Sequence, residues 1–316
     1  METGCAMNSE EKQKEKQLYT FSNETGDAEL AVYTVFPGIQ VIYNSVHMDR
    51  FDLNFKRTTG NYIEIHHCRE GRIEQEYENE FFYLMPGDLS IDIRTRMAEE
   101  YNFPMRHYHG VTIAIDTDVA PKCFSAFMQD YTVQPLEVAK RLCRENSCFI
   151  FRSESRIEHI FTELYTVAEE QKLGYLKIKI LELLYVLNSM NPDDNKKTEL
   201  ILPRTQVQLA KDVAAYLTQN MNRHINSLEL SREFGVSESS LKLAFKGVYG
   251  VPMFSYMRYY KMQTAAELLV NTKLTISEIA GQLGYSNESK FSAAFRQIIG
   301  EPPAKFRSLH TKMKIL

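Results

Sequence analysis

The first part of the chain alternates short apolar runs with turn signals, a pattern typical of β-structure. The runs lie at residues 32–36, 41–43, 62–66, 81–85, 89–93 and 111–115. Pro37-Gly38, Thr59-Gly60, Glu70-Gly71 and Pro86-Gly87 separate them. Many short strands at this spacing predict a barrel or a sandwich over residues 18–120. Residues 1–17 are polar and charged, and we expect a disordered tail there.

After residue 120 the apolar period becomes helical. Ile157, Ile160, Phe161 and Leu164 recur at the spacing of one helix face, and residues 176–187 are apolar nearly all round. Such a helix must be buried, either against the barrel or against a second subunit. We therefore expect a helical dimerisation or coupling region at 121–190. The proline and polar residues that follow predict a linker at 191–202.

The C-terminal region, residues 203–316, contains an internal repeat with a period of 49–50 residues. The corresponding pairs are Glu229-Leu230-Ser231 with Glu278-Ile279-Ala280, Gly235 with Gly284, Phe245 with Phe295, Gly250 with Gly300, and Pro252 with Pro302. One supersecondary unit therefore occurs twice.

Each copy has the pattern of a helix-turn-helix. In the second copy the apolar stripe Ile276, Ile279, Ala280 and Leu283 ends at Gly284, which supplies the positive φ of a sharp turn. Ser286 or Asn287 then caps a helix with the stripe Phe291, Ala294, Phe295, Ile298 and Ile299. The first copy repeats this with Leu228 and Leu230, Gly235, the cap Ser237, and the stripe Leu241, Ala244, Phe245, Val248 and Tyr249. A single helix over 253–270 is predicted to join the copies.

The outward faces of the two second helices carry the candidate DNA contacts. They are Ser239, Ser240, Lys242, Leu243 and Lys246 in the first copy, and Asn287, Ser289, Lys290, Ser292, Ala293 and Arg296 in the second. Small polar side chains allow close approach to base edges, while Lys and Arg reach phosphates or guanine. Two such helices on one face would enter successive major grooves, about 34 Å apart.

Charge and composition agree with a two-domain DNA-binding protein. The 316 residues carry a formal charge of −4, but residues 203–316 hold 15 Lys or Arg against 8 Asp or Glu, and the remainder holds 22 against 33. A basic domain on an acidic protein points to a polyanion bound by one domain. No apolar stretch is long enough for a membrane span, and the polar N-terminus lacks an export signal, so we expect a cytoplasmic protein. Five scattered cysteines without a CxxC pair suggest reduced thiols.

These residues resemble the AraC/XylS family of bacterial transcription regulators over about residues 206–307. The most specific matches are residues 276–280 and 284–291, Ala294-Phe295-Arg296, Gly300 and residues 302–307. The resemblance implies a transcription factor, usually an activator, that acts with RNA polymerase. It places base-reading positions at Ser239, Lys242, Leu243, Lys290, Ser292 and Ala293.

The N-terminal half is similar to the cupin-like sensor barrels of such regulators through Phe36-Pro37-Gly38, Glu70-Gly71 and residues 83–89. The resemblance implies an α+β protein in which a small effector binds the barrel and changes promoter binding, with a homodimer possible. It does not identify the effector.

The main alternative is a metal-dependent cupin enzyme fused to a DNA-binding module, with His66, His67, Cys68, His107 and His109 as metal ligands. Adjacent His66 and His67 must point to opposite faces of a strand, which disfavours this alternative. A DNA-repair alkyltransferase is disfavoured because it needs a four-cysteine zinc site. We therefore expect no enzyme activity, no catalytic residue, no metal and no cofactor. His66, Arg69, His107 and His109 remain as candidates for effector binding.

Overall fold

The computed structural model describes residues 16–52, 61–77, 80–94, 100–122, 133–143, 148–152, 155–192 and 202–313. The chain divides into two compact units, Met1–Ile201 and Leu202–Leu316, which are described separately. The boundary falls within the segment 191–202 for which a linker was predicted.

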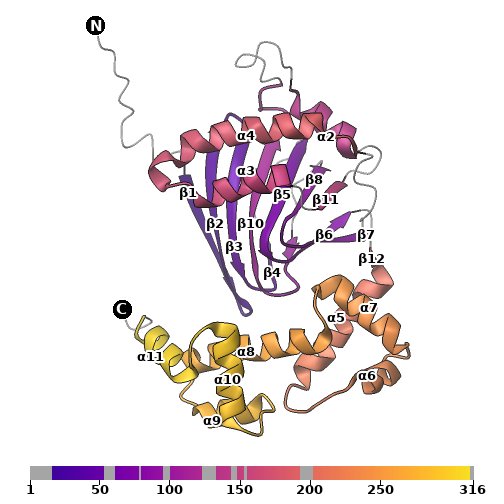
Figure 1. Ribbon diagram of the computed structural model, residues 1–316, viewed down its shortest axis with the longest axis vertical. Coiled ribbons are helices and arrows are strands. Elements are labelled where there is room, and N and C mark those ends of the chain that lie inside the picture. Colours follow the sequence, from indigo (N-terminus) through magenta and orange to yellow (C-terminus); the bar gives the residue numbers. More distant parts are fainter. Residues whose placement is uncertain are drawn as a thin grey trace. The chain divides into compact units, whose positions relative to one another are not determined.

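Unit 1 contains a seven-stranded antiparallel sheet in the order β1-β2-β3-β10-β5-β8-β11 (Figure 1). The strands are β1 (Lys16–Asn23), β2 (Gly26–Phe36), β3 (Ile39–His47), β10 (Tyr108–Asp116), β5 (Tyr62–Gly71), β8 (Asp88–Arg94) and β11 (Cys148–Arg152). Strand β1 already begins at Lys16, inside the segment 1–17 that was expected to be disordered. The rest of that segment lies outside the described residues.

A second sheet in unit 1 has the order β7-β6-β9-β4. Its strands are β7 (Glu80–Leu84), β6 (Ile73–Tyr77), β9 (Glu100–Asn102) and β4 (Arg50–Asp52). The mixed α+β class is confirmed. The strand pairings of the described residues form two sheets and do not close a barrel, so the closed form of the predicted barrel is not seen.

All six apolar runs predicted as strands fall on strands, except that Met85 lies just beyond β7. Strand β11 was not predicted, because it lies in the region 121–190 that was expected to be helical. Its residues Cys148 to Phe151 are all buried. A short apolar run of this kind has no period that separates a buried strand from a buried helix.

Three α-helices of unit 1 pack on one face of the seven-stranded sheet: α2 (Pro135–Cys143), α3 (Ser155–Thr166) and α4 (Lys172–Ser189), with the short 3₁₀ helix η1 (Glu169–Gln171) before α4 (Figure 1). Their apolar side chains share one core with the sheet, in which Ile160 and Leu183 join Val41 and Ile113. The helices are therefore buried against their own sheet.

Helix α4 departs from the prediction on its outer side. Ile178 is 62% exposed and Tyr185 is 40% exposed, so the helix is not buried all round. A sequence that is apolar on every face does not reveal which face the sheet covers.

A second core in unit 1 contains residues from both sheets. Val46 and Cys68 come from the seven-stranded sheet, Phe51 and Leu84 come from the second sheet, and Tyr108 is fully buried with them. Cys143 and Cys148 are buried as well, and all three cysteines are free thiols. Cys5 and Cys123 lie outside the described residues.

Unit 2 is helical. It contains the short strand β12 (Leu202–Pro203), then α5 (Arg204–Gln219), α6 (Ser227–Glu233), α7 (Glu238–Tyr249), α8 (Met253–Asn271), α9 (Ile276–Gln282), α10 (Glu288–Ile299) and α11 (Pro303–Met313). The single helix predicted over 253–270 is α8. Across the described residues of both units, no helix combines the length and apolar character needed to cross a membrane.

Candidate nucleic-acid interface

Unit 2 contains the two predicted helix-turn-helix pairs, α6 with α7 and α9 with α10 (Figure 1). Gly235 and Gly284 follow the first helix of each pair with φ of +65° and +74°. The predicted left-handed turn is therefore confirmed in both copies. Gly284 is also tightly enclosed, since a Cβ there would lie 2.8 Å from the Met221 carbonyl oxygen.

The second helix of each pair is capped at both ends by its own sequence. The Ser237 hydroxyl accepts a hydrogen bond from the Ser240 backbone N–H at 3.1 Å. In the second copy Asn287, rather than Ser286, is the cap, and its side chain accepts from Ser289 N–H at 2.7 Å. Gly250 and Gly300 end these helices in the left-handed conformation. Both helices are thus fixed in length and direction by local hydrogen bonds.

The predicted apolar stripes face the core with one exception. Leu241, Phe245, Phe291 and Phe295 are fully buried. Leu228, however, is 47% exposed, while Leu230 in the same helix is buried. Residues two apart on a helix point about 200° apart, so these two leucines cannot share one core face.

On α7 and on α10, the candidate DNA contacts lie on the face that is turned away from the buried apolar stripe. The exposed ones are Ser239, Ser240, Lys242, Leu243, Lys246, Asn287, Ser289, Lys290, Ala293 and Arg296, and Ser292 is partly exposed. Leu243 is 66% exposed. Each helix therefore presents a face of cationic, small polar and apolar side chains to solvent.

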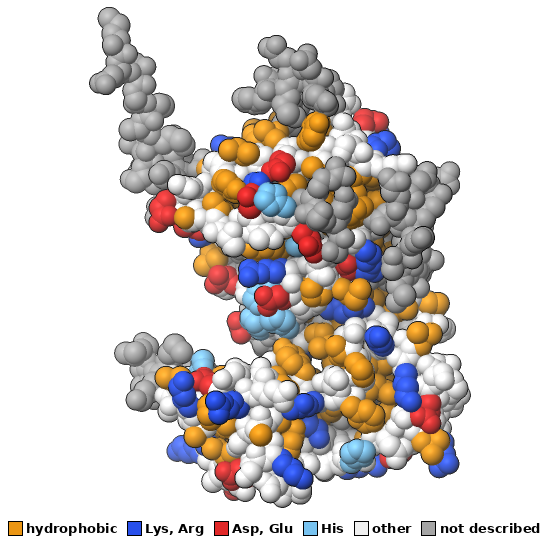
Figure 2. Space-filling view, in the orientation of Figure 1, with side chains coloured by type: hydrophobic (Ala, Val, Ile, Leu, Met, Phe, Trp, Pro, Cys, Tyr) orange, Lys and Arg blue, Asp and Glu red, His pale blue; other side chains and the backbone are white. Residues whose placement is uncertain are grey.

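The electrostatic character of unit 2 follows its composition. Figure 2 shows Lys and Arg side chains spread over the visible face of this unit, with fewer Asp and Glu. On α7 the Lys242 ammonium lies 3.3 Å from the Glu238 carboxylate one turn earlier. This exposed pair is weak, so the lysine is able to leave it for a phosphate or a base.

Arg307, part of the sequence signature, has a structural role. Its guanidinium, on α11, donates to the backbone carbonyl of Leu269 at 3.0 Å and to that of Leu274 at 2.5 Å. These carbonyls lie at the end of α8 and just before α9. Arg307 therefore fixes the connection between α8 and the second helix pair. The sequence alone did not distinguish this structural role from the roles of the other signature residues.

In unit 1 the candidate effector residue His66 is buried within a charged network. Its Nδ1 lies 3.1 Å from the Thr112 hydroxyl, and its Nε2 lies 3.2 Å from a Glu64 carboxylate oxygen. Asp92 and Arg94 complete the network. A cavity of about 30 Å³ adjoins it, lined mainly by apolar residues together with Glu64 and Thr112. A cavity of that volume holds water rather than an organic effector.

His67 lies on the other face of β5, as predicted from its adjacency to His66. Its ring stacks on Phe161 of α3 with the ring centroids 3.9 Å apart, and its Nδ1 lies 3.1 Å from the Tyr165 hydroxyl. Burial lowers the pKa of His67 from its ordinary 6.5 to about 4. His67 is therefore a neutral side chain of the interface between the sheet and the helices.

This burial predicts a pH-dependent stability of unit 1. In the unfolded chain His67 becomes protonated below pH 6.5, whereas in the folded chain it becomes protonated only below about pH 4. The free energy of unfolding therefore decreases as the pH falls through this window. The loss at His67 between pH 8 and pH 5 is about 2 kcal/mol. His67→Phe keeps the ring stack and removes the titration. Urea unfolding at both pH values should show a smaller loss in this variant, and an equal loss would contradict the prediction.

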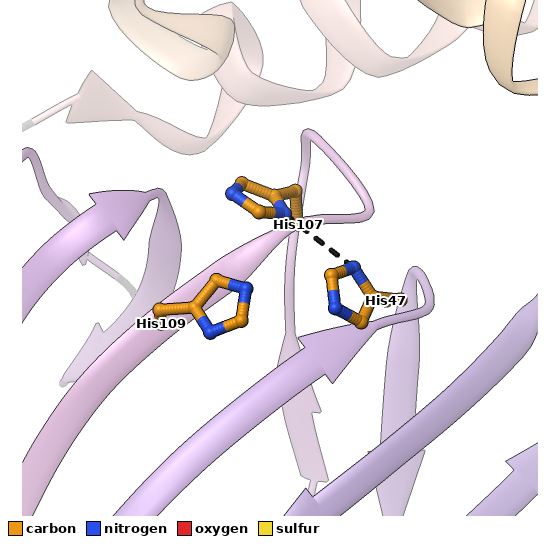
Figure 3. Close-up of side chains that lie close together, drawn as sticks. All are labelled: His47, His107 and His109. Atoms are coloured by element: carbon orange, nitrogen blue, oxygen red, sulfur yellow. Dashed lines mark hydrogen bonds between the residues drawn. The ribbon is translucent and has the colours of Figure 1, made fainter. Parts of the chain in front are cut away.

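The remaining effector candidates lie at one end of the seven-stranded sheet. His107 and His109 are half-buried at the start of β10, beside His47 at the end of β3 (Figure 3). Arg69 is exposed, with its guanidinium 4.8 Å from the centre of the Tyr165 ring. His66 does not join His107 and His109 in the cluster. Sequence reasoning missed His47, because only the register of β3 against β10 brings it to them.

Comparison with known proteins supports the helix-turn-helix assignment. A family profile described as "Helix-turn-helix domain" matches residues 230–308. The "Probable transcriptional regulator LumQ" of Photobacterium leiognathi is 26% identical over 156 residues, which are 49% of this chain and 60% of that protein. The "F1 operon positive regulatory protein" of Yersinia pestis is 33% identical over 98 residues, 31% of this chain and 33% of its own.

Among solved structures, the C-terminal domain of AraT, a response regulator from Geobacillus stearothermophilus, is similar with 26% identity and a TM-score of 0.31. The similarity covers 32% of this chain and 84% of that one. The family profile and the curated relatives confirm the predicted resemblance to AraC-type regulators, and the profile match at residues 230–308 lies within unit 2. The chain covers 60% and 33% of the two curated relatives.

Proposed function

We propose that this protein is a sequence-specific DNA-binding transcriptional regulator of the AraC type and is not an enzyme. One observation carries the proposal: two helix-turn-helix pairs with the same left-handed glycine turn, each with a second helix capped at both ends, present exposed faces of candidate DNA contacts. The curated relatives named above are described as regulators.

In the proposed complex α7 and α10 enter successive major grooves, about 34 Å apart along the DNA. Lys242 and Lys290 reach guanine acceptors or phosphates, and the serines of both helices hydrogen-bond to base edges or phosphates. Leu243 is placed to contact a thymine methyl group, because an exposed apolar side chain loses nothing by entering a groove there. Arg296 is assigned to the phosphate backbone.

Unit 1 is proposed as a cupin-like sensor that binds a small effector and changes promoter occupancy or contact with RNA polymerase in the cytoplasm. Activation is the expected direction. The exposed Ile178 and Tyr185 lie seven residues apart on α4 and so share one face of that helix. We propose that this face mediates a homodimer. The effector residues remain the candidates His66, Arg69, His107 and His109.

DNA binding is tested by selecting bound genomic fragments and titrating one of them with the full chain. Replacing Lys242 or Lys290 with Ala should weaken specific binding by about 1 to 3 kcal/mol, or roughly 5- to 150-fold, if the lysine reads a base. Arg296→Ala should weaken all sequences alike and reduce the slope of log affinity against log salt by about one. Fluorescence anisotropy at several salt concentrations measures both effects.

Lys305→Ala provides the matched control. Lys305 is an exposed lysine on α11, paired with Glu301 at 3.5 Å and outside both recognition helices. Its removal should leave sequence preference unchanged. If the selection yields no preferred fragment, or if Lys305→Ala weakens specific binding as much as Lys290→Ala, the proposed interface is wrong.

A further inference from the structure

Three histidine side chains converge at one end of the seven-stranded sheet (Figure 3). His47 ends β3, His107 precedes β10, and His109 lies within β10. Each offers a ring nitrogen, and these nitrogens all lie within 4.8 Å of one another. The Nδ1 atoms of His47 and His107 are 3.5 Å apart.

This spacing matches the requirements of a small divalent ion. In a tetrahedral zinc site with Zn–N distances of about 2.0 to 2.1 Å, two ligand nitrogens are about 3.4 Å apart. The His47–His107 pair already has that separation. The three histidine nitrogens all lie within 4.8 Å of one another, so no pair exceeds that separation by more than about 1.4 Å.

The second nitrogen of His107 has a partner suited to a metal-binding histidine. While Nδ1 faces His47, Nε2 lies 3.7 Å from a carboxylate oxygen of Glu70 on β5. A metal-bound histidine usually directs its other ring N–H to a carboxylate, which orients the ring and strengthens the ligand.

The backbone holds the histidines in place from two sides. Gly26 and Gly71 have φ of +146° and +78°, and a Cβ on them would lie 2.0 Å and 1.9 Å from the carbonyl oxygens of His47 and His107. Arg106, directly before His107, has a left-handed φ of +52°, and its guanidinium donates to the Thr25 carbonyl. The backbone at His47 and His107 is thus closely packed against neighbouring turns.

We propose that His47, His107 and His109 form a binding site for one divalent transition-metal ion, with Zn²⁺ as the preferred ion and Glu70 as the residue that orients His107. Nitrogen ligands without thiolates suit Zn²⁺ over Mg²⁺ or Ca²⁺, which prefer oxygen. Three protein ligands leave a fourth position for water. The site belongs to unit 1 and the proposed DNA contacts belong to unit 2, so a failure of metal binding is distinguishable from a failure of DNA binding. His107 and His109 are shared with the candidates for effector binding.

The test uses the full chain after removal of bound metal with a chelator. Titration with Zn²⁺ against a chromogenic chelator should give one equivalent bound per chain. His107→Ala and His109→Ala should each weaken binding by at least about tenfold, and Glu70→Gln should weaken it by about tenfold through the orientation of His107. With Co²⁺ in place of Zn²⁺, the protein should show the intense visible absorption of tetrahedral cobalt, and His47→Ala should abolish it.

His159→Ala is the matched control, since His159 is an exposed histidine on α3 with a Glu163 carboxylate 3.6 Å away. It should retain the full equivalent. Circular dichroism checks that each variant is folded, and Zn²⁺ should raise the melting temperature of the parent chain but not of the folded His107→Ala variant. Absence of stoichiometric Zn²⁺ in the parent chain, or equal loss in His159→Ala, would overturn the proposal.

Discussion

Replacing Gly284 with Ala is expected to destabilise the second helix-turn-helix by about 2 to 5 kcal/mol. A non-glycine residue in the left-handed conformation costs about 1 to 2 kcal/mol. The added methyl group also meets the Met221 carbonyl oxygen at 2.8 Å and the Asn222 backbone at 3.0 Å. Such overpacking costs about 1 to 3 kcal/mol more, because backbone cannot move aside as a flexible side chain would.

The first copy of the repeat supplies the matched control. Gly235 has nearly the same φ, +65° against +74°, but nothing lies within 4 Å of the position where a Cβ would be. Gly235→Ala should therefore cost only the conformational part, about 1 to 2 kcal/mol. Hydrogen–deuterium exchange resolved by peptide should show faster opening of α9 and α10 in Gly284→Ala than of α6 and α7 in Gly235→Ala. Equal effects in the two copies would show that the close packing at Gly284 is energetically unimportant.

Unit 2 could be predicted from sequence because its signals are local. A glycine with positive φ, a capping side chain and an apolar stripe of helical period lie within about twenty residues of one another, and the repeat presents them twice. The exposed faces of α7 and α10 followed directly, since a helix with one buried stripe leaves its other residues outside. The prediction that Leu228 faces the core was wrong because α6 has only seven residues, too few for the apolar period to identify its buried face.

Unit 1 was less predictable because its sites depend on strand register. The sequence distance between His47 and His109 gives no hint that β3 pairs with β10. His66 illustrates the converse. The sequence grouped it with His107 as a candidate for effector binding, but its side chain lies in a different environment, the network with Glu64 and Thr112. Pairing between distant strands is decided by the whole sheet, whereas turn chemistry is decided by a few residues.

Arg94 contributes a positive charge to the buried network around His66. Arg94 lies with its Nε 3.5 Å from Glu64 and its Nη2 3.6 Å from Asp92, and both carboxylates are almost completely buried. Burial acts to raise the pKa of Glu64, but the hydrogen bond from His66 and the charge of Arg94 outweigh it, and the pKa lies below its ordinary value. The buried Glu64 carboxylate is thus stabilised by His66 and Arg94 beside it.

Arg94→Met is therefore expected to destabilise unit 1 by about 3 to 5 kcal/mol, as removal of one member of a buried ion pair does. The methionine fills much of the volume of the arginine stem, so the loss is mainly electrostatic. Urea unfolding at neutral pH measures the loss. Lys140→Met, which removes an exposed lysine 3.2 Å from Glu137, should change stability by less than about 1 kcal/mol.

A second substitution distinguishes an electrostatic cause of the stability loss in Arg94→Met from a packing defect. In Arg94→Met the uncompensated charge on Glu64 is the main cost, so adding Glu64→Gln should restore part of the stability, with a coupling of about 1 to 3 kcal/mol between the two positions. A packing defect would instead make the two losses add. The single variant Glu64→Gln should itself be destabilised, because His66 then loses its carboxylate partner at 3.2 Å. Recovery in the double variant therefore means that the arginine stabilises unit 1 by neutralising buried carboxylates.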